Sequence, residues 1–134
     1  MSIELRPVDV HSQFDMDTLY KLLTERQPYQ AISHKTMPTF GEHKRFVKSL
    51  PYKGWHLIWV GPICVGSTYI THANELGIFI FRKHIGNGYA KEAIEEMMDR
   101  YEGPFLANVN PDNEASKKFF EGLGFKMIQV TYAK

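Results

Sequence analysis

The residues with the clearest chemical potential form a short glycine-rich turn, Gly86-Asn87-Gly88-Tyr89-Ala90. An apolar run typical of a strand precedes this turn, and an amphipathic stretch typical of a helix follows it. Glycine lets the backbone approach an anion closely, and the first N–H groups of a helix are unpaired at the positive end of the helix dipole. A diphosphate would suit such a site. Taken alone, the same residues would suit an ordinary turn with a helix cap.

A second polar segment begins at Asn108 and continues to Ser116. Its asparagines follow a predicted strand, and open sheets bind ligands at the carboxyl ends of their strands, where amide groups can be recognised. Asn113 has a local role as well, because asparagine is a preferred N-cap residue. We expect Asn113 to cap the last helix and to contact a ligand.

The elements that must position these segments follow from hydrophobic periodicity and turn residues. Strands are predicted over residues 3–8, 55–60, 63–71, 76–81, 105–109 and 125–132, and helices over residues 15–27, 39–50, 89–101 and 113–123. Residues 29–38 have the composition of a loop, and Thr39 with Glu42 forms a capping-box pattern at the start of the second predicted helix. The early elements favour a meander, whereas the late ones alternate strand and helix. This order predicts an α/β protein with a mixed central sheet, helices on both faces and one domain over residues 1–134.

Composition excludes several classes of function. The formal net charge of +1 lacks the basic excess of a typical duplex-binding protein, so no nucleic-acid partner is expected. The six histidines have no metal-ligand spacing, and Cys64 is a single cysteine in an apolar run, so neither a metal site nor a disulfide is expected. No signal peptide is visible and no run approaches the ~18 apolar residues of a membrane span, which predicts a cytoplasmic protein with no membrane partner.

The glycine turn and the asparagine segment, in this order, resemble the GNAT superfamily of N-acyltransferases. That family binds the coenzyme A pyrophosphate with Gln or Arg, two residues, Gly, one residue, then Gly or Ala. Gly88-Tyr89-Ala90 matches the end of this signature, and Ile85 stands at the Gln/Arg position. Phe120-Glu121-Gly122-Leu123-Gly124-Phe125 matches the family's Tyr-Glu-x-x-Gly-Phe. The turn looks closest to acetyltransferases of ribosomal proteins and of nucleotide-linked amino sugars.

The resemblance implies that acetyl-CoA is the co-substrate and that no metal is needed. It implies that strand backbone groups bind the pantetheine arm, that the amides of residues 87–91 bind the diphosphate and that Asn113 contacts the same arm. The candidate cofactor-binding residues are Ile78, Phe79, Ile80, Gly86, Asn87, Gly88, Tyr89, Ala90, Lys91, Asn113, Ser116 and Phe120.

The catalytic residues implied by the resemblance are less complete. The family often uses a tyrosine where this chain has Phe120, which has no proton to give to the leaving thiolate. Glu75 is the candidate general base, because family members often place a glutamate in this strand, and His72 is the second candidate. In some relatives the base lies on the next strand, where this chain has Asn108. The candidates for an acceptor pocket are His34, His43, Tyr29, Trp55, Trp59, Tyr69 and Tyr132.

The first functional hypothesis is an N-acetyltransferase that moves an acetyl group to a primary amine by direct attack in a ternary complex. A small molecule such as a nucleotide-linked amino sugar is the first acceptor class. The alternatives are a protein or peptide α-amine, a non-catalytic coenzyme A-binding regulatory domain, and acetylation of charged transfer RNA, against which the near-neutral charge argues. A homodimer is a further expectation, because a partner subunit could complete the sheet.

Overall fold

The computed structural model describes residues 2–26 and 36–134. The elements along the chain are β1 (Glu4–Pro7), α1 (Gln13–Thr24), α2 (Phe40–Lys48), β2 (Gly54–Val60), β3 (Ile63–Ile70), β4 (Glu75–Ile80), a 3-10 turn η2 (Arg82–His84), α3 (Tyr89–Arg100), β5 (Leu106–Ala107) and α4 (Glu114–Gly122). The described part of the chain contains no helix that could serve as a membrane span.

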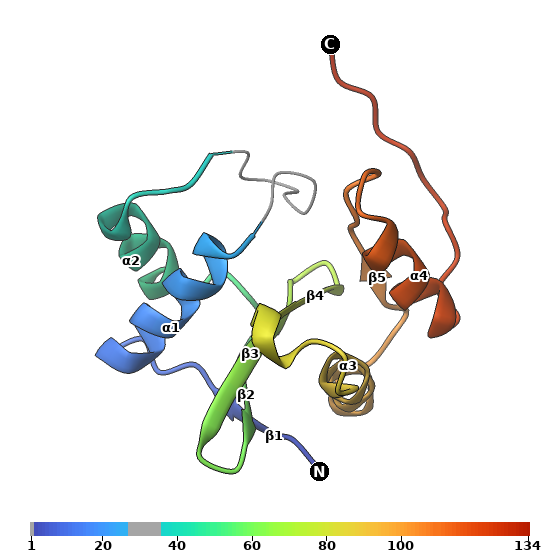
Figure 1. Ribbon diagram of the computed structural model, residues 1–134. Coiled ribbons are helices and arrows are strands. Elements are labelled where there is room, and N and C mark those ends of the chain that lie inside the picture. Colours follow the sequence, from blue (N-terminus) through green and yellow to red (C-terminus); the bar gives the residue numbers. More distant parts are fainter. Residues whose placement is uncertain (1, 27–35) are drawn as a thin grey trace.

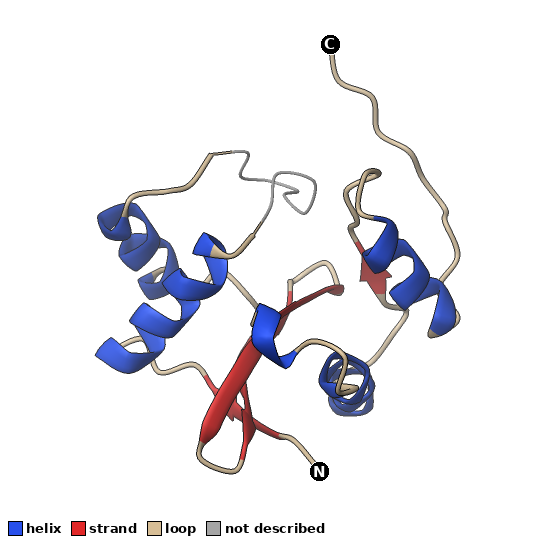
Figure 2. Cartoon of the chain, in the orientation of Figure 1, coloured by secondary structure: helices blue, strands red, loops and turns tan. Residues whose placement is uncertain are grey.

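One mixed sheet organises the chain, as the sequence predicts. Its strand order is β1-β2-β3-β4-β5, with antiparallel pairing from β1 to β4 and parallel pairing between β4 and β5. The parallel pair is joined by a crossover through α3, as parallel strands require. In Figure 1, α1 and α2 lie to one side of the sheet and α3 and α4 to the other, and Figure 2 shows the same arrangement by element type.

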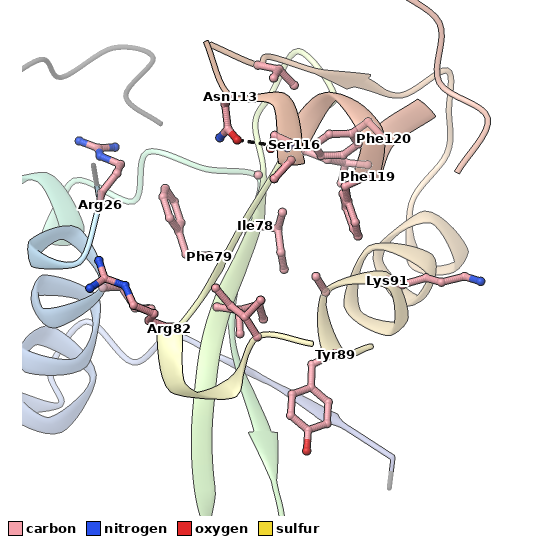
Figure 3. Close-up of a pocket in the computed structure, with 18 of the residues that line it drawn as sticks. Arg26, Ile78, Phe79, Arg82, Tyr89, Lys91, Asn113, Ser116, Phe119 and Phe120 are labelled. Carbon is pink, nitrogen blue, oxygen red and sulfur yellow. Dashed lines mark hydrogen bonds between the residues drawn. The ribbon is translucent and has the colours of Figure 1, made fainter. Parts of the chain in front are cut away.

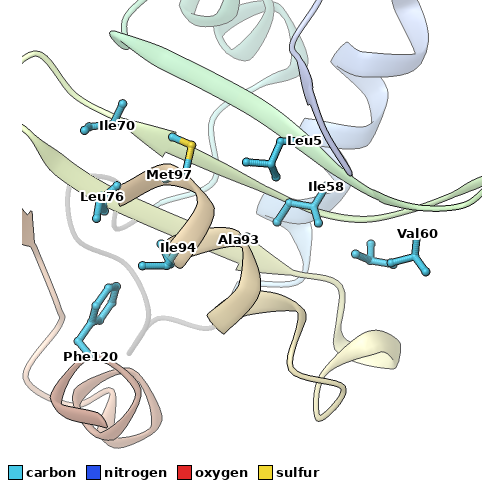
Figure 4. Close-up of a cluster of buried hydrophobic side chains, with 10 residues drawn as sticks. Leu5, Ile58, Val60, Ile70, Leu76, Ala93, Ile94, Met97 and Phe120 are labelled. Atoms are coloured by element: carbon cyan, nitrogen blue, oxygen red, sulfur yellow. The ribbon is translucent and has the colours of Figure 1, made fainter. Parts of the chain in front are cut away.

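Each face of the sheet has its own apolar core, because successive strand residues point to opposite faces. On one face, Ile58 and Leu76 pack with Ile94 and Met97 of α3 and with Phe120 of α4 (Figure 4). On the other face, Leu57 packs in a second cluster with side chains of α1 and α2, which are Met16, Leu19, Leu22 and Val47. Four helices are thereby fixed against the sheet that carries β4.

Local capping signals place four of the helix ends. The Thr39 hydroxyl accepts from the Glu42 N–H at 3.1 Å while the Glu42 carboxylate accepts from the Thr39 N–H at 2.8 Å, which confirms the predicted capping box of α2. Asn113 caps α4, and Gly124 just past its end has a left-handed φ of 93°. Ser12 caps α1, so that helix begins two residues before the predicted start.

Two predicted strands differ from the structure. Residues 105–109 were expected as one strand, but β5 pairs only through Leu106 and Ala107, because the chain then diverges from β4. The strand predicted over 125–132 is wrong: these residues make no ladder within the described chain. Alternating side chains favour a strand, but a strand forms only where a neighbour supplies hydrogen bonds. Residues 29–35 of the loop predicted over 29–38 lie outside the described residues.

Gly66 of β3 fixes how closely β4 can approach its neighbour. A Cβ atom there would overlap the carbonyl oxygen of Phe79, a backbone atom that cannot rotate away. We expect Gly66→Ala to lower the free energy of unfolding by about 2 kcal/mol or more, since overpacking at such a site costs about 1–3 kcal/mol. Urea unfolding would measure this change.

The matched control is Gly41→Ala in α2, where an added Cβ meets nothing within 4 Å. This change should leave stability equal or raise it by about 0.5 kcal/mol, because alanine favours helix over glycine. Equal stability of the Gly66 and Gly41 variants would contradict the close approach of β3 and β4.

Candidate functional site

A cavity of about 670 Å³ opens beside β4 and extends to the start of α3. Figure 3 shows its lining: β4 residues such as Ile78 form one wall, the first turn of α3 another, and Asn113 and Phe119 of the α4 region face them. The cavity exists because the ladder between β4 and β5 ends early. β5 pairs with Glu75 and Leu76 alone, so the rest of β4 borders open space on that side.

The hydrogen-bonding pattern between β3 and β4 determines which backbone groups of β4 border the cavity. Thr71 N–H donates to the Glu75 carbonyl at 2.9 Å, and Phe81 N–H donates to the Val65 carbonyl at 2.9 Å. The odd-numbered residues of β4 therefore direct their backbone groups toward β3, and the even-numbered ones toward the β5 side. Ile78 and Ile80 are the even-numbered residues beyond the β5 ladder. Their N–H and C=O groups face the cavity and need partners there.

Phe79 differs from its two neighbours. Its backbone pairs with Ser67 of β3, while its side chain packs on the α1 side of the sheet and lines the cavity. All three predicted strand residues therefore border the cavity, but only Ile78 and Ile80 can offer backbone hydrogen bonds to a ligand.

The glycine turn forms the far end of the cavity. Gly86 and Gly88 have left-handed φ values of 93° and 78°, and a Cβ at either position would meet nothing within 4 Å. Gly88 is the N-cap of α3, and the first helical hydrogen bond runs from Glu92 N–H to the Gly88 carbonyl at 3.2 Å. The amides of residues 89–91 consequently have no partner inside the helix. They point from the positive end of the helix dipole, which suits an anion such as a phosphate.

The asparagine segment closes the opposite wall. The Asn113 side chain accepts from the Ser116 N–H at 3.1 Å, which confirms the predicted cap, and both residues line the cavity. Asn113 retains its side-chain N–H groups for a ligand. Phe120 is 6% exposed and packs edge-to-face on Phe119 and Phe125, so it closes the floor as an apolar ring without a transferable proton.

Glu75 is placed differently from the cofactor-binding candidates. Its carboxylate accepts from the Thr71 hydroxyl at 3.0 Å and from the Asn108 side-chain amide at 2.5 Å. These bonds tie the end of β3 and the start of β4 to the chain that leaves β5, and Glu75 is not part of the cavity lining. His72 is exposed in the β3–β4 connection and lies outside the lining too.

Three lining residues had no motif to reveal them in the sequence. Arg26 and Arg82 lie on the α1 side of the cavity, and burial lowers the pKa of Arg26. Arg82 is held by its backbone N–H, which donates to the Glu25 carboxylate at 2.7 Å. Both arginines add positive charge, which favours an anionic ligand. In the sequence, Arg26 falls near the end of the helix predicted over 15–27, and Arg82 comes just after the strand predicted over 76–81.

Tyr69 is the third of these residues, and the sequence suggested it only as one aromatic among several. Its ring stacks on Tyr52 at 4.1 Å between centroids and lies over Gly77 of β4. Burial, followed by the nearby charge of Glu75, raises the pKa of the Tyr69 hydroxyl. Tyr69 therefore remains a neutral donor at the cavity wall.

The other acceptor-pocket candidates lie elsewhere. His43 is buried between α1 and α2, with its ring nitrogen 3.3 Å from the Met16 carbonyl, and burial lowers its pKa. Trp55 and Trp59 pack against the second core, and Tyr132 is 92% exposed, so these three and His43 do not belong to the cavity lining. Tyr29 and His34 lie outside the described residues.

Two further expectations concern reactive and metal-binding groups. Cys64 is half-buried, and burial raises the pKa of its thiol, as expected of a cysteine that serves packing rather than attack. Among residues 2–26 and 36–134, no group of three His, Cys, Asp or Glu side chains could hold a metal ion.

Comparison with known proteins gives one family. The model of the acetyltransferase (GNAT) domain matches residues 2–126. No curated protein sequence matches the chain. Among solved structures, an acetyltransferase from Thermus thermophilus is 22% identical with a TM-score of 0.75, covering 96% of this chain and 90% of its own.

Two structures from Salmonella typhimurium also share the fold. YncA, solved with its cofactor acetyl-CoA, is 14% identical with a TM-score of 0.67, covering 93% of this chain and 80% of its own. The acetyl transferase that modifies the N-terminal serine of ribosomal protein L7/L12 is 19% identical with a TM-score of 0.70, covering 91% of this chain and 79% of its own.

The hydrogen bonds of Glu75 lead to a stability prediction. Glu75→Ala should lower the free energy of unfolding by about 1–3 kcal/mol, because the Thr71 hydroxyl and the Asn108 side-chain amide lose their shared acceptor. His72→Ala, at an exposed position three residues earlier, should change it by less than about 0.5 kcal/mol. Thermal or urea unfolding of both variants measures the difference, and equal stability would contradict a structural role for Glu75.

Proposed function

This chain belongs to the GNAT family of acetyltransferases, and we propose that it transfers the acetyl group of acetyl-CoA to a primary amine in a ternary complex. The observation that carries the proposal is the continuity of one cavity from the unpaired edge of β4 to the free amides of α3. An extended ligand with amide groups along its length and a diphosphate at one end matches this order of partners.

The residues present suit the pantetheine arm and the diphosphate of acetyl-CoA. Backbone groups of Ile78 and Ile80 would bind the two amides of the pantetheine arm as a strand neighbour would. The amides of residues 89–91 would bind the diphosphate, with Gly86 and Gly88 leaving room for close approach. The remaining N–H groups of Asn113 would contact the arm from the α4 side. Ile85, which stands at the Gln/Arg position of the family's pyrophosphate-binding signature, is 64% exposed and offers no polar side chain.

Acetyl-CoA supplies an activated acyl group as a thioester. A neutral amine nitrogen attacks the thioester carbonyl carbon, a new C–N bond forms, and the C–S bond breaks with release of the thiolate. The nitrogen loses a proton to water or to the base, which leaves a neutral amide. Backbone N–H groups at the cavity edge of β4 would stabilise the charge that develops on the carbonyl oxygen. Phe120 cannot protonate the thiolate, so it leaves unassisted or takes its proton from water. A coenzyme A thiol is a good leaving group, and the reaction does not require an acid there.

The attacking amine must be free of its extra proton. We keep Glu75 as the proposed general base, acting through water, with His72 as the second candidate. The support for Glu75 is electrostatic proximity: its charge acts on Tyr69, which does line the cavity. The two hydrogen bonds on its carboxylate argue for a structural role in addition.

A small amine, such as an amino sugar, is the first proposed acceptor class. The aromatic rings of Tyr69 and Phe79 line the α1 side of the cavity, and such rings suit an acceptor with an apolar or sugar face. A protein or peptide α-amine is the second candidate, favoured by the shared fold with the Salmonella typhimurium enzyme that modifies ribosomal protein L7/L12.

The binding of acetyl-CoA is tested by isothermal titration of the wild type and a Gly88→Val variant. Valine is disfavoured at the left-handed φ of 78°, so the amides of α3 should shift and the Kd should weaken about ten-fold or more. Gly124→Val is the matched control, since Gly124 has a left-handed φ of 93° but lies outside the cavity lining. It should lose similar stability and keep the wild-type Kd. Equal binding by all three proteins would contradict the site.

The role of Glu75 is tested by Glu75→Gln, which keeps its shape and one oxygen acceptor. If Glu75 is the base, kcat for thiol release should fall about 100-fold or more while the Kd for acetyl-CoA is unchanged, and the acid limb of the pH–rate profile should disappear. Thiol release with a panel of amines, amino sugars first, measures this. An unchanged profile would exclude Glu75 as the base, and binding without thiol release for any amine would favour a regulatory coenzyme A-binding domain.

A further inference from the structure

Three hydrogen-bond donors lie on the α1 side of the cavity, apart from the glycine turn. They are the guanidinium groups of Arg26 and Arg82 and the hydroxyl of Tyr69, and all three residues line the cavity. In Figure 3, Arg26 and Arg82 lie on the α1 side of β4, whereas Lys91 lies with α3 on the other side. The first turn of α3 offers its own amides to a diphosphate. The donors on the α1 side are therefore available to a different part of the substrates.

Local contacts direct Arg82 toward α1. Its backbone N–H donates to the Glu25 carboxylate at 2.7 Å, and its side-chain Nη2 donates to the Glu25 carbonyl at 3.2 Å. A carbonyl oxygen carries no net charge, so this side-chain bond orients the guanidinium without neutralising it. The bond uses one of the five N–H groups of an arginine side chain. Arg82 can therefore hold a ligand while it remains fixed at the end of α1.

Arg26 reaches the same wall from the end of α1. Its backbone N–H donates to the Leu23 carbonyl at 3.1 Å, which extends the last turn of the helix. Its guanidinium carbon lies 6.0 Å from the centre of the Phe79 ring. The side chain is half-buried, and burial lowers its pKa, while Tyr69 and Tyr52 act on this pKa in the opposite direction. A guanidinium that is partly removed from water attracts an anion more strongly than a fully solvated one.

Tyr69 adds a neutral donor on the same side. It pairs with Gly77 of β4, and its ring and hydroxyl occupy the space that a side chain at Gly77 would fill. Stacking on Tyr52 holds the ring there. Because burial raises the pKa of the Tyr69 hydroxyl, the group keeps its proton and can donate to an anion. The missing side chain of Gly77 thus places this donor against the strand that borders the cavity.

The charges of the cavity lining favour a second anion besides the diphosphate. Among the described lining residues, the Arg and Lys side chains are Arg26, Arg82 and Lys91, against the single carboxylate of Glu25. That carboxylate already accepts a hydrogen bond from the Arg82 backbone. The α3 end suits the diphosphate, and the two arginines give the α1 side a positive charge of its own. This is the side on which the aromatic rings would receive the acceptor.

We propose that the acceptor is a small amine that carries an anionic group, a carboxylate or a phosphate, and that Arg26, Arg82 and Tyr69 bind this group. The proposal rests on the transfer function proposed above and adds the charge of the acceptor to it. A planar guanidinium donates two parallel N–H···O bonds to either anion. With the anion held on the α1 side, the amine end of the same molecule reaches toward β4, where the thioester carbonyl would lie.

Isothermal titration into the protein saturated with coenzyme A tests the anion site without requiring catalysis. The ligands share one amino-sugar ring and differ at C6: glucosamine, glucosamine 6-phosphate and 2-amino-2-deoxyglucuronic acid. One or both anionic ligands should bind about ten-fold or more tightly than glucosamine, because hydrogen bonds to charged groups are worth at least this factor. The phosphate and the carboxylate show which anion the site prefers. Equal Kd values for all three ligands would overturn the proposal.

The substitutions Arg26→Gln and Arg82→Gln test the assigned residues. Each should reduce the preference for the anionic ligand about ten-fold, while the Kd for acetyl-CoA stays at the wild-type value. Arg45→Gln is the matched control, because Arg45 is an exposed arginine of α2 outside the cavity lining, and it should keep the wild-type preference. Weaker acetyl-CoA binding with an unchanged preference would assign the arginines to the co-substrate and overturn the proposal.

Thiol release from acetyl-CoA with the same three ligands separates the failure of this proposal from that of the transfer function. Tighter binding of the anionic ligands without thiol release from any of them would support the anion site and contradict the transfer function. Thiol release at equal kcat/KM with all three ligands, together with equal Kd values, would support the transfer function and overturn the charge preference.

Discussion

A strand whose neighbour departs after two paired residues must satisfy its remaining backbone groups in another way. β4 is held along one edge by five paired positions of β3, from Gly66↔Ile80 to Ile70↔Leu76, whereas β5 leaves it after Leu76. Within the part of the chain that the structure describes, no strand then pairs with Ile78 and Ile80 on that side. This incomplete ladder creates the cavity, sets its direction and gives its wall a fixed alternation of donors and acceptors.

The rest of the fold holds this opening in place. α3 packs on β4 through Ile94 and Met97, so the glycine turn that begins α3 is fixed at the end of the unpaired edge. Phe120 joins α4 to the same core and maintains the far wall. Glu75 links β3, β4 and the chain beyond β5 at the point of divergence. A flexible ligand would thus meet partners whose spacing is already set, which reduces the entropy lost on binding.

Local signals in the sequence were sufficient to predict one part of the structure. The capping box at Thr39 and Glu42, the Asn113 cap and the glycine turn depend on neighbours within a few residues, and the sequence predicted each of them. An apolar run predicted a strand at 105–109 and alternation predicted one at 125–132, but strand formation depends on partners that are distant in sequence. Arg26, Arg82 and Tyr69 reach the cavity from the end of α1, η2 and β3, and no motif records that convergence. The sequence placed Glu75 at the start of the central strand, but it gave no sign that the carboxylate accepts hydrogen bonds from Thr71 and Asn108.

The most direct test of the proposed binding site is amide hydrogen exchange, resolved residue by residue by NMR, with and without acetyl-CoA. Acetyl-CoA should slow exchange at Ile78, Ile80 and residues 89–91. Phe79 N–H, which lies on the β3 side of the strand, should exchange slowly in both states. Protection of the glycine turn alone would place the pantetheine arm elsewhere. No protection at either segment, in a protein that remains folded, would contradict the claim that the open edge of β4 is the binding site.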